Sequence, residues 1–184
     1  MNPSSNLFLI GPTGAGKTSV GRRLAAHYGL SFIDLDQEIE RQTGVNIPTI
    51  FEIEGEAGFR QRESQLLDTC SARANVLLAT GAGAVLDGAN AGKLAARGFV
   101  VWLQASIEQQ LERLERDTHR PLLAGTDRRA RLQSMAEIRE PLYRRIADLA
   151  VAGGSNTIAT AGDRCIDLID RHWQRQPTRP PQTA

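Results

Sequence analysis

The sequence predicts an α/β fold in which helices cover both faces of a parallel β-sheet. Short apolar runs alternate with longer segments of helical periodicity, which is typical of parallel strands connected by helices. The apolar runs are nearly continuous, as expected for strands buried on both faces. With 184 residues, of which 41% are hydrophobic, the chain can form one domain with a sizeable core.

The elements follow this pattern from the N-terminus onward. Most apolar runs end at a glycine or an aspartate and are interpreted as strands, and the periodic segments between them are interpreted as helices. The predicted strands are 7–10, 31–36, 75–80, 99–103 and, with a weaker pattern, 156–160. The predicted helices are Lys17–Tyr28, Gln37–Gln42, Phe59–Arg73, Ala89–Arg97, Ser106–Arg116, Arg131–Val151 and Asp163–Arg175.

Two segments interrupt the alternation. The stretch "RPLLAGTDRRA", residues 120–130, carries a proline and a glycine among charged residues and predicts a mobile loop between two helices. The proline-rich polar segment 176–184 predicts a disordered tail. We therefore expect a single domain over residues 1–175, with a lid at about 118–130.

The charge balance argues against nucleic-acid and membrane partners. The formal net charge of +1 provides no excess positive charge for a phosphate backbone or an anionic membrane surface. No stretch approaches the about 18 apolar residues of a membrane span, and the apolar run 7–10 lacks the basic segment that begins a signal peptide. We expect a cytoplasmic protein, and the small size favours a monomer.

The two cysteines, Cys70 and Cys165, lie far apart and have no metal-ligand spacing. The sequence alone leaves a disulfide open. In a cytoplasmic protein, two buried free thiols are the favoured interpretation.

The segment "GPTGAGKT", residues 11–18, matches the P-loop pattern G-x-x-x-x-G-K-T between a predicted strand and a predicted helix. Backbone N–H groups of such a loop can surround a diphosphate. Lys17 would reach the β and γ phosphates, and Thr18 would offer its hydroxyl to Mg²⁺. The alternative, a glycine-rich turn entering an ordinary helix, rarely meets all the required positions. The motif predicts nucleotide binding.

Asp34 and Asp36 lie two residues apart at the end of the second predicted strand. If the strand persists, both carboxylates lie on one face, at the edge where ligands of open α/β sheets bind. One could hold a Mg²⁺-bound water and the other a substrate hydroxyl. Asp36 could instead cap the helix predicted to begin at Gln37.

Three arginines are candidates for anion contacts. Arg60 is predicted in the first turn of a helix, where the helix dipole disfavours a cation unless Glu63 or a substrate carboxylate compensates it. Arg120 begins the flexible loop, where it could close over a transferring phosphoryl group or remain solvated. Arg139 lies on the long helix after the loop, among arginines that are mostly surface charges.

The combined motifs GPTGAGKT, DLDQEIE, FEIEGEAGFRQRE, ATGAGAV, RPLL and REPLY, in this order and spacing, closely resemble shikimate kinase over about residues 6–150. The resemblance implies a P-loop kinase fold of the nucleoside-monophosphate-kinase type, with a five-stranded parallel sheet and a mobile lid. It also implies ATP- and Mg²⁺-dependent phosphorylation of the 3-hydroxyl of shikimate, a step of chorismate and aromatic amino-acid biosynthesis.

The resemblance also implies roles for individual residues. Asp34 would reach one Mg²⁺ ion through water together with Thr18, and Asp36 would contact the ring hydroxyls and act as base. The substrate carboxylate would bind Arg60 and Arg139. The residues implied to bind ATP are Gly14, Ala15, Gly16, Thr18, Ser19, Arg113 near the adenine, and the catalytic Lys17 and Arg120. Phe51 and Phe59 would line the substrate pocket, and the contacts of the 155–163 loop with adenine remain unassigned.

The turn Gly81-Ala82-Gly83 would form the floor of the acceptor site, where the family has three glycines. The middle residue would offer its backbone N–H to the substrate. An alanine keeps this N–H, so we expect Ala82 to be tolerated unless its backbone needs a positive φ or the substrate ring packs against its Cα.

Two other functions remain as alternatives. A related small-molecule kinase, such as a gluconate kinase, has less need of paired arginines beside aromatic side chains. A nucleotide-dependent switch or binding module would be expected to carry the guanine motif N-K-x-D or to have lost its catalytic residues, and the sequence shows neither.

Overall fold

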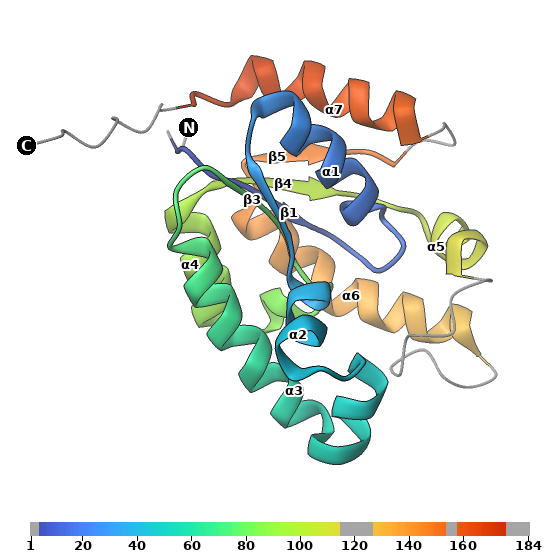
Figure 1. Ribbon diagram of the computed structural model, residues 1–184. Helices are drawn as coiled ribbons and strands as arrows, with labels where there is room; N and C mark the ends of the chain where they lie inside the picture. The colour runs from blue at the N-terminus through green and yellow to red at the C-terminus, as the bar shows by residue number, and fades with distance from the viewer. Residues whose placement is uncertain (1–3, 115–126, 154–157, 176–184) are drawn as a thin grey trace, which may run out of the picture.

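Five strands form one parallel sheet in the order β2-β3-β1-β4-β5, as Figure 1 shows. The computed structural model describes residues 4–114, 127–153 and 158–175, and the structural statements below concern these residues. The strands are β1 (Leu7–Ile10), β2 (Ser31–Asp34), β3 (Val76–Ala79), β4 (Phe99–Leu103) and β5 (Leu149–Val151). The predicted five-stranded parallel α/β fold is confirmed.

The helices form a layer on each face of the sheet (Figure 1). Along β1, Leu7 and Leu9 pack into one core and Phe8 and Ile10 into the other, because successive side chains of a strand point to opposite faces. The first layer holds α1 (Lys17–Tyr28) and α7 (Ile158–His172). The second holds α2 (Leu35–Thr43), α3 (Ile47–Ser71), the 3-10 turn η1 (Ala84–Leu86), α4 (Gly88–Arg97) and α6 (Arg128–Ile146), and α5 (Ile107–Leu114) lies beside α6.

The connections that leave the neighbouring strands β1 and β3 cross opposite faces of the sheet. Helix α1 leads from β1 to β2 across one face, and α4 leads from β3 to β4 across the other. In open α/β sheets, ligands bind at the carboxyl ends of the strands where connections diverge in this way. The P-loop follows β1 and the turn 81–83 follows β3, so the topology places both glycine-bearing segments at this position.

The fifth strand was predicted in the wrong place. Residues 158–160 form the first turn of α7, and β5 is the segment Leu149–Val151, which the sequence pattern had assigned to a helix. The backbone N–H of Asp148 donates to Val100 O at 2.9 Å, and its carboxylate accepts from Val100 N at 2.8 Å. Pairing with β4 therefore outweighs the local helical pattern.

Helix α3 begins twelve residues earlier than the sequence predicted, at Ile47 in place of Phe59. Asn46 caps it by accepting a hydrogen bond from Thr49 N at 2.9 Å. The helix is kinked at Gly55, whose φ of 70° and ψ of −178° are not helical. Gly55 and Gly58 in this segment disfavour a helix when judged from the sequence, whereas the Asn46 cap stabilises one.

The remaining structural expectations have mixed outcomes. Cys70 and Cys165 are both buried and free, as expected.

None of the helices in the described part of the chain is long and apolar enough to cross a membrane. Residues 118–126 of the predicted lid and the tail 176–184 lie outside the described residues, and residues 128–130 form the first turn of α6.

The buried side-chain amide of Asn6, just before β1, binds backbone groups near the ends of α3 and α4 and at the start of β3. Its Nδ2 donates to the carbonyl oxygen of Arg73 at 2.7 Å and to that of Arg97 at 3.3 Å, and its Oδ1 accepts from Val76 N at 3.1 Å. The side chain thereby holds the ends of α3 and α4 against the sheet.

We predict that Asn6→Ala lowers the free energy of unfolding by about 2–4 kcal/mol, because it leaves several buried backbone groups unpaired. Asn90→Ala is the matched control, since Asn90 is also buried and, among the residues described, its side-chain amide donates only to Ser64 Oγ, at 2.9 Å. It should cost about 1 kcal/mol. Urea denaturation measures both, and equal losses would contradict this account of Asn6.

Candidate active site

The P-loop, residues 11–18, joins β1 to α1. Gly11 has a φ of 139°, and a Cβ there would overlap the carbonyl oxygen of Leu103 on the neighbouring strand. Gly16 has a φ of 87° and precedes α1 without any side-chain cap, and the first N–H groups of a helix have no acceptor within the helix itself. The loop can therefore present several backbone donors to an anion.

Lys17 and Thr18 begin α1. The ammonium of Lys17 donates to the carbonyl oxygens of Gly11 and Pro12, at 2.8 Å each, and so lies across the loop. The hydroxyl of Thr18 donates to Asp34 Oδ2 at 2.6 Å. The structure thus brings the two predicted metal-binding residues into contact, whereas no group of three His, Cys, Asp or Glu side chains suited to a metal occurs among the residues described.

The prediction that Asp34 and Asp36 share a strand face is wrong. Strand β2 ends at Asp34, which caps α2 by accepting from Gln37 N at 3.2 Å, and Asp36 lies in the first turn of that helix. The turn of the helix still directs Asp36 toward the 81–83 turn, since its Oδ1 lies 3.0 Å from where a Cβ on Gly81 would be. Asp36 therefore lies at the implied acceptor site, although the first turn of α2, and not strand β2, places it there.

Arg60 and Glu63 form an ion pair beneath the 81–83 turn. The kink at Gly55 puts Arg60 beyond the first helical turn, contrary to the prediction. Its Nη1 donates to Glu63 Oε2 at 2.7 Å and its Nη2 to Glu56 Oε1 at 3.0 Å. Glu63 is 1% exposed and its Oε1 has no hydrogen-bond partner. Burial raises the pKa of Glu63, while Arg60 opposes the rise.

The 81–83 turn is shaped by this pair. A Cβ on Gly81 would overlap Glu63 Oε1, and a Cβ on Gly83 would overlap the guanidinium of Arg60. Ala82 does not have a positive φ, since Asn75 is the one non-glycine residue with that conformation among those described. The backbone therefore accepts alanine at the middle position, whereas a Cβ at either flanking position would displace Glu63 or Arg60.

Arg139 approaches the same turn from α6. It is half-buried, and burial lowers the pKa of its guanidinium, with Arg60 lowering it further. Arg60 and Arg139 are thus close enough to repel each other. Within the described part of the chain Arg139 forms no salt bridge, so an anion between the two guanidinium groups would stabilise the arrangement.

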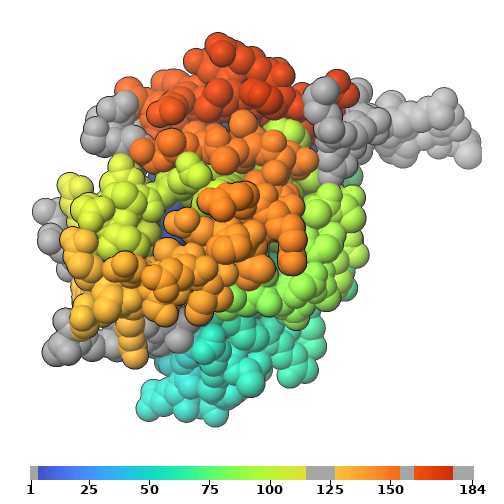
Figure 2. Space-filling view, turned by 180° about the vertical axis from the view of Figure 1, so that it is seen from behind, coloured from blue at the N-terminus to red at the C-terminus, as the bar shows by residue number. Residues whose placement is uncertain are grey.

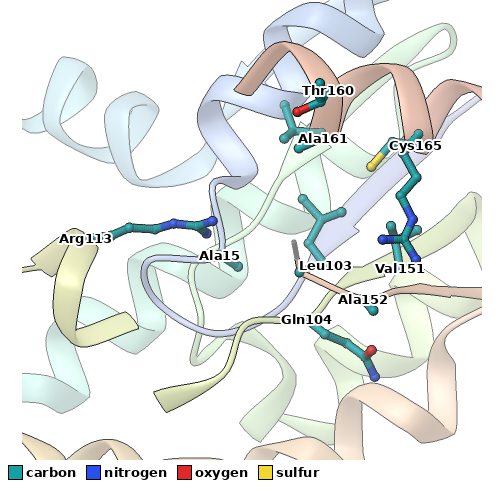
Figure 3. Close-up of a pocket in the computed structure, with 12 residues that line it drawn as sticks. Ala15, Leu103, Gln104, Arg113, Val151, Ala152, Thr160, Ala161 and Cys165 are labelled. Atoms are coloured by element: carbon teal, nitrogen blue, oxygen red, sulfur yellow. The ribbon is translucent and has the colours of Figure 1, made fainter. Parts of the chain in front are cut away.

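A pocket adjoins the other side of the P-loop. Arg113 Nη1 donates to the Gly14 carbonyl oxygen at 2.8 Å, and Figure 3 shows Arg113 reaching from α5 toward the loop near Ala15. Thr160 and Cys165 of α7 line the opposite wall. The pocket lies where the sequence resemblance implied the adenine, and its further lining residues are Val20, Leu103, Gln104, Val151, Ala152, Gly153, Ala161 and Arg164.

Other predicted site residues have simpler outcomes. The rings of Phe51 and Phe59 lie 4.9 Å apart on α3, next to the Arg60 guanidinium. Ser19 follows Thr18 in the first turn of α1 and is exposed. Arg120 and residues 154–157 of the predicted adenine loop lie outside the described residues.

Two buried residues contribute to the site beyond what the sequence predicted. Glu63 was considered only as a local partner of Arg60, although its carboxylate supports Gly81 as well. Tyr143, whose hydroxyl donates to the Ala82 carbonyl oxygen at 2.5 Å, was not singled out. Its spacing of four residues from Arg139 puts the two on one helix face and could have indicated it.

The comparisons with known proteins agree with this geometry. A family model described as shikimate kinase matches residues 13–170. The chain belongs to the shikimate kinase family. It is 47% identical to the shikimate kinase of Methylococcus capsulatus over 95% of this chain and 98% of the relative, and 49% identical to that of Stenotrophomonas maltophilia strain R551-3 over 96% and 98%.

Solved structures give the same result. The shikimate kinase from Acinetobacter baumannii in complex with shikimate has a TM-score of 0.88 and 42% identity, covering 92% of this chain and 95% of that one. A gluconokinase from Sinorhizobium meliloti has a TM-score of 0.60 at 17% identity, covering 92% of this chain and 93% of that one, which indicates a shared fold.

We predict that the stability of this shikimate kinase family member relative to its Glu63→Gln variant falls as the pH rises from about 4 to about 8. A carboxyl whose pKa is raised by folding contributes stability below its unfolded pKa and loses it as the pH rises through the folded pKa. Glutamine does not titrate, so the difference isolates Glu63. Urea denaturation across this pH range measures it, and a difference that stays constant or increases with pH would contradict the raised pKa.

Proposed function

We propose that this protein transfers the γ-phosphoryl group of ATP to the 3-hydroxyl of shikimate, giving 3-phosphoshikimate and ADP. The reaction would serve as a step of chorismate and aromatic amino-acid biosynthesis. Family membership supports a kinase activity, and the relatives that match over nearly the whole chain are named shikimate kinases. The solved relative from A. baumannii is described as a complex with shikimate.

The observation that carries the proposal is the approach of two guanidinium groups to the 81–83 turn beside the P-loop. Arg60 lies against Gly83, and Arg139 is near enough to Arg60 for the two charges to interact. A carboxylate between them would relieve the repulsion and accept planar paired hydrogen bonds from both. Shikimate carries one carboxylate and three ring hydroxyls, which suits this cation pair and the nearby Asp36.

On the nucleotide side, the N–H groups of Gly14, Ala15, Gly16 and the first turn of α1, Ser19 included, would bind the ATP phosphates. Lys17 would exchange the loop carbonyls for phosphate oxygens. Arg113 would lie near the adenine, and Arg120 would cover the phosphates and neutralise charge that develops in the transition state.

One Mg²⁺ ion is proposed to accompany ATP. Thr18 Oγ1 and the Asp34 carboxylate, in contact at 2.6 Å, are hard oxygen donors of the kind Mg²⁺ prefers, so they suit this ion. When bound, the ion would neutralise charge on the phosphates. Thr18 would contribute its hydroxyl as a ligand, and Asp34 would hold a water of the ion.

On the acceptor side, Asp36 would orient the ring hydroxyls and accept the proton of the attacking 3-hydroxyl. Arg60 and Arg139 would fix the carboxylate at the opposite end of the ring, and the Ala82 N–H would contact the substrate. Most of the rate enhancement would come from holding this hydroxyl in line with the γ-phosphate.

The alternative functions have less support. The gluconokinase likeness extends to the fold alone at 17% identity. A degenerate, non-catalytic binding module would be expected to have lost some of these residues, whereas Lys17, Thr18 and Asp34 are all present and Thr18 contacts Asp34. We further propose that the protein acts as a monomer in the cytoplasm, with ATP and shikimate as its partners and without nucleic acid or membrane.

A coupled assay of ADP formation tests the proposed function directly. Purified protein with ATP and Mg²⁺ is offered shikimate, gluconate and a panel of other hydroxy acids. Shikimate should be the preferred acceptor by orders of magnitude in kcat/KM, and the product should carry phosphate on the 3-oxygen by NMR. Phosphorylation of another acid in preference to shikimate would refute the substrate, and no turnover at all would refute the kinase.

We predict that Ala82→Gly leaves kcat/KM for shikimate within about threefold of wild type, since alanine already adopts the required backbone and keeps its N–H. Steady-state kinetics measures the ratio. An increase of tenfold or more would show that the methyl group impairs the acceptor site.

We predict that Gly83→Ala lowers kcat/KM for shikimate by about 100-fold, because the new methyl group displaces the Arg60 guanidinium from the carboxylate position. Gly88→Ala is the matched control, since its Cβ would meet nothing within 4 Å, and it should retain wild-type kinetics. Similar kinetics for both variants would contradict the proposed position of Arg60 against the turn.

A further inference from the structure

Tyr143 connects α6 to the 81–83 turn through its hydroxyl. The side chain is 1% exposed, and its hydroxyl donates to the Ala82 carbonyl oxygen at 2.5 Å. The ring packs against Trp102 of β4 at a centroid distance of 5.8 Å. In Figure 2, α6 (orange) and α4 (green) lie against each other over this face of the sheet, and the two helices are in contact.

The carbonyl group that Tyr143 binds belongs to the peptide unit between Ala82 and Gly83. Fixing this oxygen fixes the plane of the peptide, and with it the direction of the Gly83 N–H on the opposite side. Neither the Ala82 N–H nor the Gly83 N–H donates to an acceptor among the described residues. A hydrogen bond to the carbonyl also polarises the peptide and strengthens its N–H as a donor.

The turn is held from two helices. On the α3 side, Glu63 lies against Gly81 and Arg60 against Gly83. On the α6 side, Tyr143 binds the carbonyl of the middle residue. Arg139 lies one helical turn before Tyr143 and interacts with its hydroxyl. The hydrogen bond therefore fixes both the turn and the helix that carries the second guanidinium.

We propose that Tyr143 is a positioning residue for the acceptor: its hydroxyl sets the 81–83 backbone and Arg139 in one geometry that is complementary to a carboxylate-bearing hydroxy ring. This inference rests on the proposed function, since shikimate is the ring that the site would bind. Burial holds the pKa of the phenol well above its usual value, with the Arg139 charge opposing, so the hydroxyl stays a donor.

Removing the hydroxyl tests the proposal with little change in packing. In Tyr143→Phe, the KM for shikimate should rise about tenfold, because the turn loses its hydrogen bond to α6, the helix that carries Arg139. The KM for ATP and kcat should stay within about twofold and about threefold of wild type, since the P-loop is untouched. Thermal unfolding checks that the variant is folded under the assay conditions.

The second tyrosine of the chain provides a matched control. Tyr28 is the last residue of α1, on the opposite face of the sheet, and donates its hydroxyl to Asp170 of α7 at 2.8 Å. Tyr28→Phe likewise removes a tyrosine hydroxyl that donates a hydrogen bond, and its KM for shikimate should equal that of wild type. A shikimate KM within about twofold of wild type for Tyr143→Phe, or an equal rise in both variants, would overturn the proposal.

A second measurement keeps the hydroxyl of Tyr143 in place. The chain has two tyrosines, so replacing both with 3-fluorotyrosine gives two ¹⁹F signals, and Tyr28→Phe assigns them. Shikimate should shift the Tyr143 signal and leave the Tyr28 signal unchanged. An unchanged Tyr143 signal at saturating shikimate would overturn the proposal even if Tyr143→Phe did not fold.

Failure of the proposed function and failure of the Tyr143 inference give different results. A wild-type protein that does not phosphorylate shikimate overturns the proposed function and this inference with it. A wild-type protein that does so, with a Tyr143→Phe variant of unchanged shikimate KM, overturns the inference alone.

Discussion

The buried ion pair of Arg60 and Glu63 is the interaction on which the acceptor site depends. Glu63 is almost fully removed from solvent, and a carboxylate in that position requires a nearby cation. Arg60 provides the cation at 2.7 Å and is held in turn at a fixed position against the 81–83 turn. The two side chains fill the space where Gly81 and Gly83 lack a Cβ, so the pair also determines which residues the turn can contain.

The order of the strands explains why this pair lies beside a nucleotide site. Strands β1 and β3 are neighbours whose outgoing connections cross opposite faces of the sheet. The P-loop and the 81–83 turn are therefore adjacent without contributing to the same loop. Phosphoryl transfer needs two ligands held end to end, and a fold with two separate loops at one switch point can adjust each loop to its own ligand.

Local sequence signals predicted most of the fold. Helix α1 begins and ends where predicted, because the P-loop lysine and Gly29, which adopts the left-handed conformation at its end, mark both boundaries. Strand β5 was misplaced because three residues at the sheet edge carry too little pattern, and pairing with β4 decides their conformation. Tertiary contacts have no local signature of this kind.

The same distinction applies to the site. The P-loop and the arginines could be named from motifs, since those chemistries require particular residues at particular spacings. The depth of Glu63 and the bond from Tyr143 to Ala82 could not, because burial depends on how α3 and α6 pack on the sheet. A crystal structure with ADP and shikimate tests the central claim most directly. The account predicts the shikimate carboxylate between Arg60 and Arg139 and a ring hydroxyl on Asp36; a carboxylate bound away from both arginines would contradict it.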